Sequence, residues 1–109
     1  MPQIAGGAVD GASQDYITAV TTTYTVLPTD EFVQCKTTGG SYTVSLPNPN
    51  TMTGQTVRVE NTDGTNTVTV NGATASWIRV AGKSTLTNNG SQVSYKSDGT
   101  FWNNLGAVS

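Results

Sequence analysis

The chain has 109 residues, a net charge of −2, no histidine, a single cysteine and 11% charged residues. Its length fits one domain, and the lack of histidine excludes Ser–His and Cys–His catalytic pairs and histidine metal sites. From residue 24 onward, five acidic and five basic residues cancel, so this part lacks the basic surface that nucleic acid or an anionic membrane requires. We expect no nucleic-acid or membrane partner, no metal and no cofactor.

Residues 1–23 are rich in glycine and alanine and have neither helical nor strand periodicity. This composition predicts a flexible N-terminal arm. Two interpretations stay open: a loosely packed terminus, or an arm that becomes ordered on a partner or on a neighbouring subunit. In the second interpretation, its anchors are the scattered apolar residues Ile4, Val9, Tyr16 and Ile17. The start has no basic residue and no apolar run, so we expect no secretory signal.

From residue 24 to 104, short Val- and Thr-rich runs alternate with Gly, Asn-Gly and Asp-Gly turns. Apolar residues at alternate positions are typical of half-buried strands, and Asn-Gly and Asp-Gly pairs favour hairpins. The expected strands are 24–27, 31–37, 41–46, 55–61, 67–71, 75–80, 84–87, 92–96 and 100–104. We therefore predict an all-β fold: a jelly-roll-like antiparallel β-sandwich or barrel of eight or nine short strands over residues 24–109.

The prolines at 47 and 49 interrupt this pattern. Proline lacks the amide donor of a ladder and holds the preceding residue extended. We expect residues 47–50 to form a connection, for which a crossing between sheets is one route, with Met52 filling a gap beneath it.

Few side chains are candidates for chemistry. Residues 61–66 alternate oxygen-bearing side chains like a calcium loop, but they lack the distal glutamate, and an Asp-Gly hairpin turn explains them. Cys35 lies on the apolar face of a predicted strand, which favours a buried thiol over a reactive one. Asp30 and Glu31 are adjacent, so on a strand they point to opposite faces. We expect no enzyme; a carboxylate-based polysaccharide hydrolase is the weakest alternative.

Three aromatic residues, Trp77, Tyr95 and Trp102, fall on predicted strands. We expect them to fill the core or a subunit interface, where aromatic side chains bury most area. The two tryptophans could instead serve as platforms on which sugars stack. The few charged neighbours available to orient sugar hydroxyls favour the first interpretation.

Five segments carry a family resemblance. They are Tyr24–Val33 (YTVLPTDEFV), Tyr42–Pro47 (YTVSLP), Gly54–Asn61 (GQTVRVEN), Val68–Val70 (VTV) and Val93–Trp102 (VSYKSDGTFW). Their order resembles a small β module of tailed-bacteriophage virion proteins, found in tail fibres and in capsid decoration proteins. The likeness covers residues 24–104, and Ser-Asp-Gly-Thr-Phe-Trp after a Val/Tyr strand is its most specific motif.

The resemblance implies a structural virion protein, often a trimer. With this length we expect neither a fibre stalk nor an attachment segment, so the chain looks more like a capsid decoration, or cement, protein. Such a protein is made in the host cytoplasm, binds the outer surface of the head and ties major capsid subunits together. The alternative is a tail-fibre or head-fibre module that binds a host glycan receptor.

Overall fold

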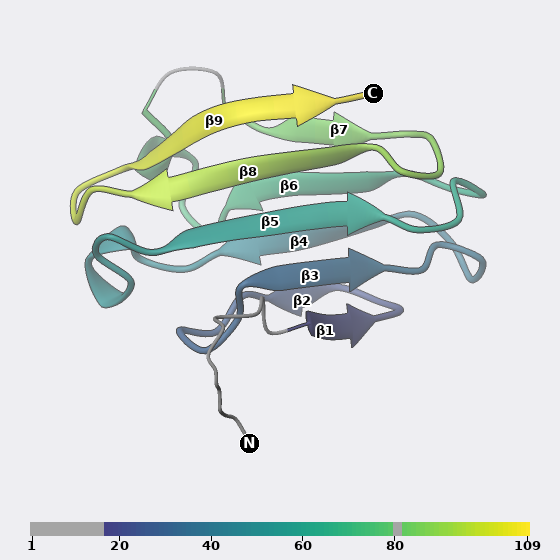
Figure 1. The fold of residues 1–109 in the computed structure, drawn as a ribbon, viewed down its shortest axis with the longest axis horizontal. Coiled ribbons are helices and arrows are strands. Elements are labelled where there is room, and N and C mark those ends of the chain that lie inside the picture. The colour runs from purple at the N-terminus through teal and green to yellow at the C-terminus, as the bar shows by residue number, and fades with distance from the viewer. Residues whose placement is uncertain (1–16, 80–81) are drawn as a thin grey trace, which may run out of the picture.

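The computed structural model describes residues 17–79 and 82–109, and these form two β-sheets packed face to face (Figure 1). The five-stranded sheet has the order β1 (Ile17–Val20), β3 (Phe32–Cys35), β5 (Thr56–Asn61), β8 (Gln92–Ser97) and β9 (Trp102–Val108). The four-stranded sheet has the order β2 (Tyr24–Thr25), β4 (Tyr42–Leu46), β6 (Val68–Gly72) and β7 (Ser84–Leu86). The predicted all-β sandwich of eight or nine short strands is confirmed.

The strand pairing differs from the predicted antiparallel, jelly-roll-like arrangement. From β1 to β6, consecutive strands alternate between the two sheets, so that β1, β3 and β5 pair in parallel, as do β2, β4 and β6. Only the β5–β8, β8–β9 and β6–β7 pairs are antiparallel. The sheets are therefore mixed, and the first half of the described chain winds around the core like a coil.

The turn signals explain why hairpins were expected. A hairpin prediction assumes that the strands on either side of a turn pair with each other. Asp63-Gly64 and Asn89-Gly90 instead connect strands of different sheets, whereas Asp98-Gly99 joins the paired strands β8 and β9. A turn dipeptide reverses the chain but does not specify whether the next strand joins the same sheet or the opposite one.

The core lies between the sheets and is built from the alternating apolar residues of the strands. Burial of these side chains is the main favourable contribution to folding. The five-stranded sheet contributes Val33, Cys35, Val57, Val59, Val93, Tyr95 and Trp102, and the four-stranded sheet contributes Val44, Leu46, Val68, Val70 and Leu86. Cys35 is buried as predicted, and burial raises the pKa of its thiol to about 12.

The proline segment crosses between the sheets, from β4 to β5. It contains a short 3₁₀ turn, η1 (Pro49–Thr51), with the Asn48 side chain accepting a hydrogen bond from the Asn50 amide. Met52 follows with no exposed surface. Met52 is therefore part of the core, while its predicted place in a gap beneath the connection stays a prediction.

Two predicted boundaries differ from the structure. Strand β1 lies within the segment 1–23 that the sequence sets apart as an arm, and it is an edge strand of the five-stranded sheet. The predicted strand 75–80 is wrong: Ala75–Trp77 form a 3₁₀ turn, η2, and Ile78 makes a single bridge to Trp102. The segment connects β6 and β7, which pair directly with each other. Val80, the last residue of the predicted strand, lies outside the described residues.

Candidate binding surfaces

Asp63 joins two separate connections at one end of the sandwich. Its carboxylate accepts hydrogen bonds from the backbone amides of Thr37 and Thr65, and from the hydroxyls of Thr37 and Thr38. The hydrogen bond from the Thr37 hydroxyl, followed by those from Thr65 and Thr38, holds the pKa of Asp63 far below its ordinary value. The β5–β6 connection is thereby tied to the β3–β4 connection.

Asn61 is buried at the start of the same connection. Its amide nitrogen donates to the carbonyls of Asn66 and Leu86, at 2.9 and 3.0 Å, and its side-chain oxygen accepts from the Gly64 amide at 2.9 Å. These hydrogen bonds, together with those of Asp63, engage the side chains of Asn61 and Asp63 within the protein. The run that superficially resembles a calcium loop is therefore a hydrogen-bonded crossing between sheets, not the hairpin that the sequence predicts.

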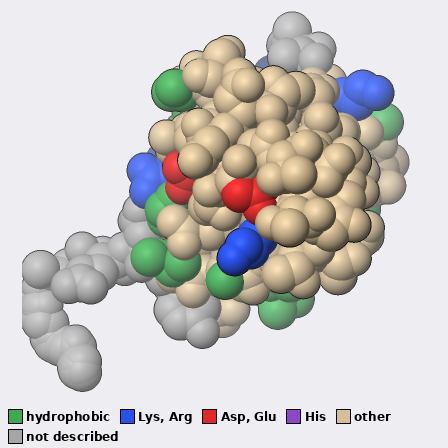
Figure 2. Space-filling model, turned by 90° about the vertical axis from the view of Figure 1, so that its right-hand side faces the viewer, with side chains coloured by type: hydrophobic (Ala, Val, Ile, Leu, Met, Phe, Trp, Pro, Cys, Tyr) green, Lys and Arg blue, Asp and Glu red, His purple; other side chains and the backbone are tan. Residues whose placement is uncertain are grey.

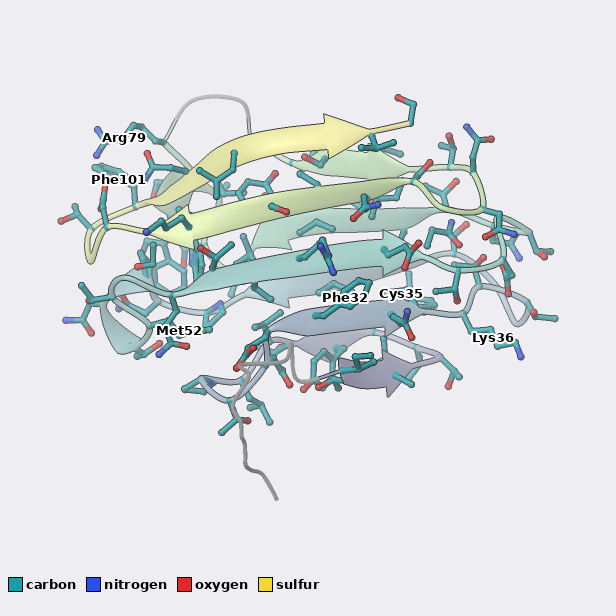
Figure 3. All side chains as sticks on the ribbon, viewed as in Figure 1. Phe32, Cys35, Lys36, Met52, Arg79 and Phe101 are labelled. Carbon is teal, nitrogen blue, oxygen red and sulfur yellow. The ribbon has the colours of Figure 1, made fainter. Side chains whose placement is uncertain are left out.

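Asp98 closes the β8–β9 hairpin at the opposite end. It accepts hydrogen bonds from the amides of Thr100 and Phe101, and the Arg79 guanidinium lies 2.7 Å from its Oδ2 atom. Arg79 and then these amides keep the pKa of Asp98 far below its ordinary value. Arg79 also lies over the Phe101 ring, 4.7 Å from its centroid (Figure 3).

Asp30 lies between β2 and β3, near the start of the described chain, and its side chain is held by hydrogen bonds. Its carboxylate accepts hydrogen bonds from the hydroxyls of Thr18 and Tyr24, both at 2.6 Å, and from the Leu27 amide at 2.8 Å. It is 2% exposed. Each of the three aspartates in the described chain therefore organises a connection. Within residues 17–79 and 82–109, no three His, Cys, Asp or Glu side chains lie together as metal ligands.

The outer face of the five-stranded sheet carries a mixed row of side chains. Strand register places Ile17, Phe32, Arg58 and Ser94 side by side. The Arg58 guanidinium lies over the Phe32 ring, 4.1 Å from its centroid. Sequence reasoning missed this cation–π pair. Neither residue belongs to a recognisable sequence motif, and their contact depends on the parallel register of β3 and β5.

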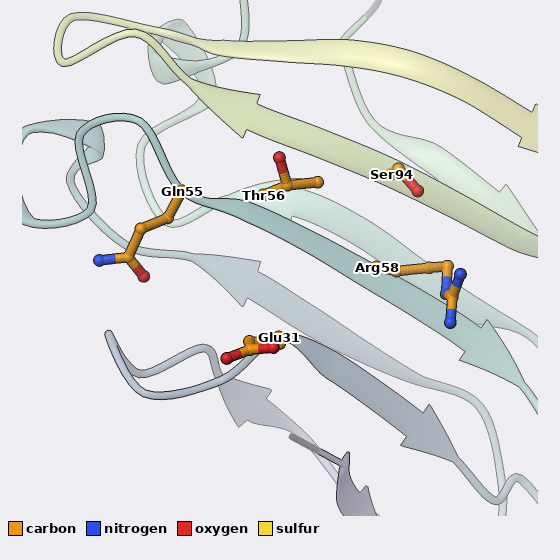
Figure 4. A pocket seen from close by; sticks show the side chains of 5 residues that line it. All are labelled: Glu31, Gln55, Thr56, Arg58 and Ser94. Carbon is orange, nitrogen blue, oxygen red and sulfur yellow. The ribbon is translucent and has the colours of Figure 1, made fainter. Parts of the chain in front are cut away.

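A shallow depression of about 490 Å³ lies beside this row (Figure 4), lined by Glu31, Gln55, Thr56, Arg58 and Ser94. A second depression of about 540 Å³ shares Glu31 and Gln55 with it and adds Pro28 and Thr29. The lining offers a carboxylate, a guanidinium, an amide and hydroxyls, which can hydrogen-bond a polar ligand. It contains no histidine or cysteine to act as a base or nucleophile.

The predicted site residues are distributed over the molecule. Tyr95 and Trp102 lie in the core with no exposed surface, and Trp77 is half-buried against it. The Tyr95 hydroxyl lies 2.6 Å from the Ser84 hydroxyl, and Trp102 Nε1 donates to the Pro47 carbonyl. Of the predicted arm anchors, Ile17 is 55% exposed on edge strand β1, and Ile4, Val9 and Tyr16 lie outside the described residues.

The end of the sandwich that holds Asp63 has few charged side chains on its surface (Figure 2). Among the described residues, there is no helix with the length and apolarity to cross a membrane. Comparisons of the chain with models of known protein families, with curated protein sequences and with solved structures give no match. A functional conclusion therefore depends on the residues themselves.

Proposed function

We propose that this protein is a bacteriophage capsid decoration protein that binds the outer surface of the head and stabilises contacts between major capsid subunits. The observation that carries the proposal is that the aspartate side chains of the described residues stabilise connections of the fold. Asp30, Asp63 and Asp98 each hold a connection in place. A decoration protein needs a rigid body and a surface for adhesion, and it needs no reactive group.

Two further features support this proposal. The segments that resemble phage virion modules are strands and connections of one sandwich, from Tyr24 to Trp102. A protein that binds only the assembled shell favours that state by mass action, because each contact across a seam adds binding free energy. As the resemblance implies, we propose that the protein acts as a homotrimer on the virion surface, with the major capsid protein as its partner.

The test is to add the purified protein to phage heads that lack it, assembled from the major capsid protein of the same genome. Sedimentation should recover the protein with the heads in a fixed ratio to the capsid subunit. Electron cryo-microscopy should show its density repeated over the shell lattice. Protein that stays in the supernatant at saturating concentration would contradict the proposal.

A second candidate function is receptor binding by a tail-fibre or head-fibre module. The depression beside Arg58 favours it, because polar groups from β5 and β8 converge there. Trp102 offers no stacking platform for a sugar, since its side chain is buried. The same images separate the two functions, because a fibre module occupies a few sites on the particle and does not follow the shell lattice.

A further inference from the structure

The two depressions on the outside of the five-stranded sheet form one continuous trough. Glu31 and Gln55 line both of them and directly precede β3 and β5, so the trough lies where these two strands begin. The volumes of its two parts, about 490 and 540 Å³, each lie within the range of small-molecule sites. This hollow, here called the Arg58 trough, is therefore large enough for a small organic ligand.

Opposite charges lie at the two ends of the Arg58 trough. Figure 4 shows the Arg58 guanidinium and the Glu31 carboxylate pointing away from each other. In the antiparallel register of β5 and β8, Arg58 pairs with Ser94 and Thr56 pairs with Lys96. The Arg58 end therefore holds two hydroxyls and has a second cation beside it. It is the end that favours an anionic group on a ligand.

Arg58 is oriented by an aromatic ring. Its guanidinium lies over the Phe32 ring, 4.1 Å from the centroid. Stacking uses the face of a guanidinium, whereas hydrogen bonds to a carboxylate are made in its plane. The chain contains a second stacked arginine that shows this division, because Arg79 lies over Phe101 and its Nη2 atom is 2.7 Å from Asp98 Oδ2. An arginine stacked on phenylalanine thus already binds a carboxylate in this molecule, and the same arrangement at Arg58 suits a carboxylate on a ligand.

The rest of the lining consists mainly of hydroxyls and an amide. It is formed by Thr29, Thr56, Ser94 and Gln55, and Pro28 is the one apolar residue among the described residues that line the trough. A hydroxyl both donates and accepts a hydrogen bond, and an amide offers one group of each kind. This lining matches a ligand whose surface carries many hydroxyls. Among the described residues, it offers no apolar hollow for the side chain of a bound peptide.

We infer that the Arg58 trough binds an acidic sugar, a ring that carries one carboxylate and several hydroxyls. The carboxylate lies in the plane of the Arg58 guanidinium, beside Ser94 and Thr56. Hydroxyls on the other side of the ring donate to the Glu31 carboxylate and exchange hydrogen bonds with Gln55. Such a site goes beyond the proposed function and does not depend on shell binding. Its ligand can be a free sugar acid or a unit of an acidic polysaccharide, and the experiment separates these sources.

The first test titrates the isotope-labelled full-length protein with glucuronate and follows the backbone amide shifts by NMR. We expect saturable binding with a Kd on the order of 1 mM, because the trough is shallow, with shifts centred on Thr56, Arg58 and Ser94. Glucose has the same ring but an alcohol in place of the carboxylate, so it should bind at least about tenfold more weakly. Acetate has the carboxylate without the hydroxyls and should be weaker by at least about the same factor.

The second test compares three variants in the same titration, each checked for folding by urea denaturation. Arg58→Gln removes the guanidinium and should weaken glucuronate binding at least about tenfold. Arg79→Gln is the matched control, because it removes the other stacked arginine, which does not line the trough, and it should bind as the wild type does. Ser94→Asp places a carboxylate beside Arg58, as Asp98 lies beside Arg79, and should weaken binding by at least about the same factor as Arg58→Gln even if that variant fails to fold.

An oligomer of glucuronate identifies the source of the ligand. Affinity at least about tenfold above that of the single sugar assigns the trough to an acidic polysaccharide, and equal affinity assigns it to a free sugar acid. Absence of saturable binding by either probe overturns the inferred site, as does equal binding of glucose or acetate, or an equal loss in Arg79→Gln and Arg58→Gln. None of these results affects the proposed function, which sedimentation with phage heads tests separately.

Discussion

Asp63-Gly64 and Asp98-Gly99 share a dipeptide, but they hold different parts of the molecule. The partners of Asp63 include Thr37, which is 26 positions away in a different connection. The backbone partners of Asp98 lie two and three positions away, in its own hairpin. One turn therefore links two crossings between the sheets through neutral donors, and the other closes its own hairpin and adds an exposed ion pair with Arg79, 19 positions away. The comparison teaches that equal turn motifs can differ greatly in what they stabilise.

The largest expected effect comes from Gly64→Ala. Gly64 has φ +69°, and an added Cβ would lie 2.4 Å from the backbone nitrogen of Asn89. We expect a loss of at least about 3 kcal/mol in the free energy of unfolding, from the left-handed backbone and from overlap with a backbone that cannot move away. Urea denaturation measures it. The matched control is Gly99→Ala, where φ is +95° and the nearest atom belongs to the Thr53 side chain. Its loss should be about 1–2 kcal/mol, and equal losses would contradict the comparison.

The second effect comes from Asn61→Ala. Removing the side chain leaves the carbonyl of Leu86 without its buried donor and the Gly64 amide without its acceptor. We expect a loss of about 2–3 kcal/mol in the free energy of unfolding, measured by the same denaturation. Asn103→Ala, in the Asp98 hairpin, removes exposed hydrogen bonds and should cost less than about 1 kcal/mol. A costlier Asn103 variant would show that the hairpin is the stronger of the two regions.

The third effect is a difference in salt dependence at low pH. Both aspartates have a folded pKa below the ordinary value of 3.8, so each stabilises the fold above that pH and loses its contribution as the pH falls toward the folded pKa. Neutral donors hold Asp63, whereas the first cause at Asp98 is the charged Arg79. High salt should therefore weaken the contribution of Asp98 and leave that of Asp63 nearly unchanged. Titrating Asp63→Asn and Asp98→Asn variants by thermal unfolding at low and high salt measures this. Equal effects of salt on the contributions of Asp63 and Asp98 would contradict this prediction.

The smallest effect is on the reactivity of Cys35. Its carbonyl accepts hydrogen bonds from the amide and the hydroxyl of Thr62, so β3 is fastened to the connection that contains Asp63. Burial and a pKa of about 12 make the thiol unreactive in the folded protein. At mildly alkaline pH, we expect a thiol reagent to label Cys35 only when the protein unfolds locally or globally and exposes the thiol. Labelling should therefore be faster in Gly64→Ala than in Gly99→Ala. Rapid labelling of the wild type would show that this end is open.

The sequence was sufficient to predict most of the strands, but it did not reveal β1 or the 3₁₀ turn η2. Period-two alternation placed Cys35 on the apolar face of a predicted strand, and Cys35 is buried. The alternation pattern predicts burial well because the polarity of each side chain is matched to its own surroundings. The same pattern does not predict which strands pair. Val44 and Val70, for example, become neighbours only through a parallel register that no local pattern encodes.

The surfaces were less predictable than the core. The abundance of threonine was visible in the sequence, but the row formed by Thr43, Thr69 and Thr85 depends on the alignment of β4, β6 and β7. The pair of Arg58 and Phe32 depends on register in the same way. Trp77 shows the opposite limit, because the strand-like alternation around it did not reveal the 3₁₀ turn that Ala75–Trp77 form.

The first and last strands of the described chain occupy opposite edges of one sheet. Through the pairings β1–β3–β5–β8–β9, β1 and β9 run in the same direction, and the start of β1 and the C-terminus lie at opposite edges of the sheet (Figure 1). A pull between these two points therefore acts mainly across the strands. It peels the edge strands β1 and β9 away from β3 and β8 and breaks their ladder hydrogen bonds one after another. Stretching along this axis should therefore detach the two edge strands before the inner strands β3, β5 and β8 separate.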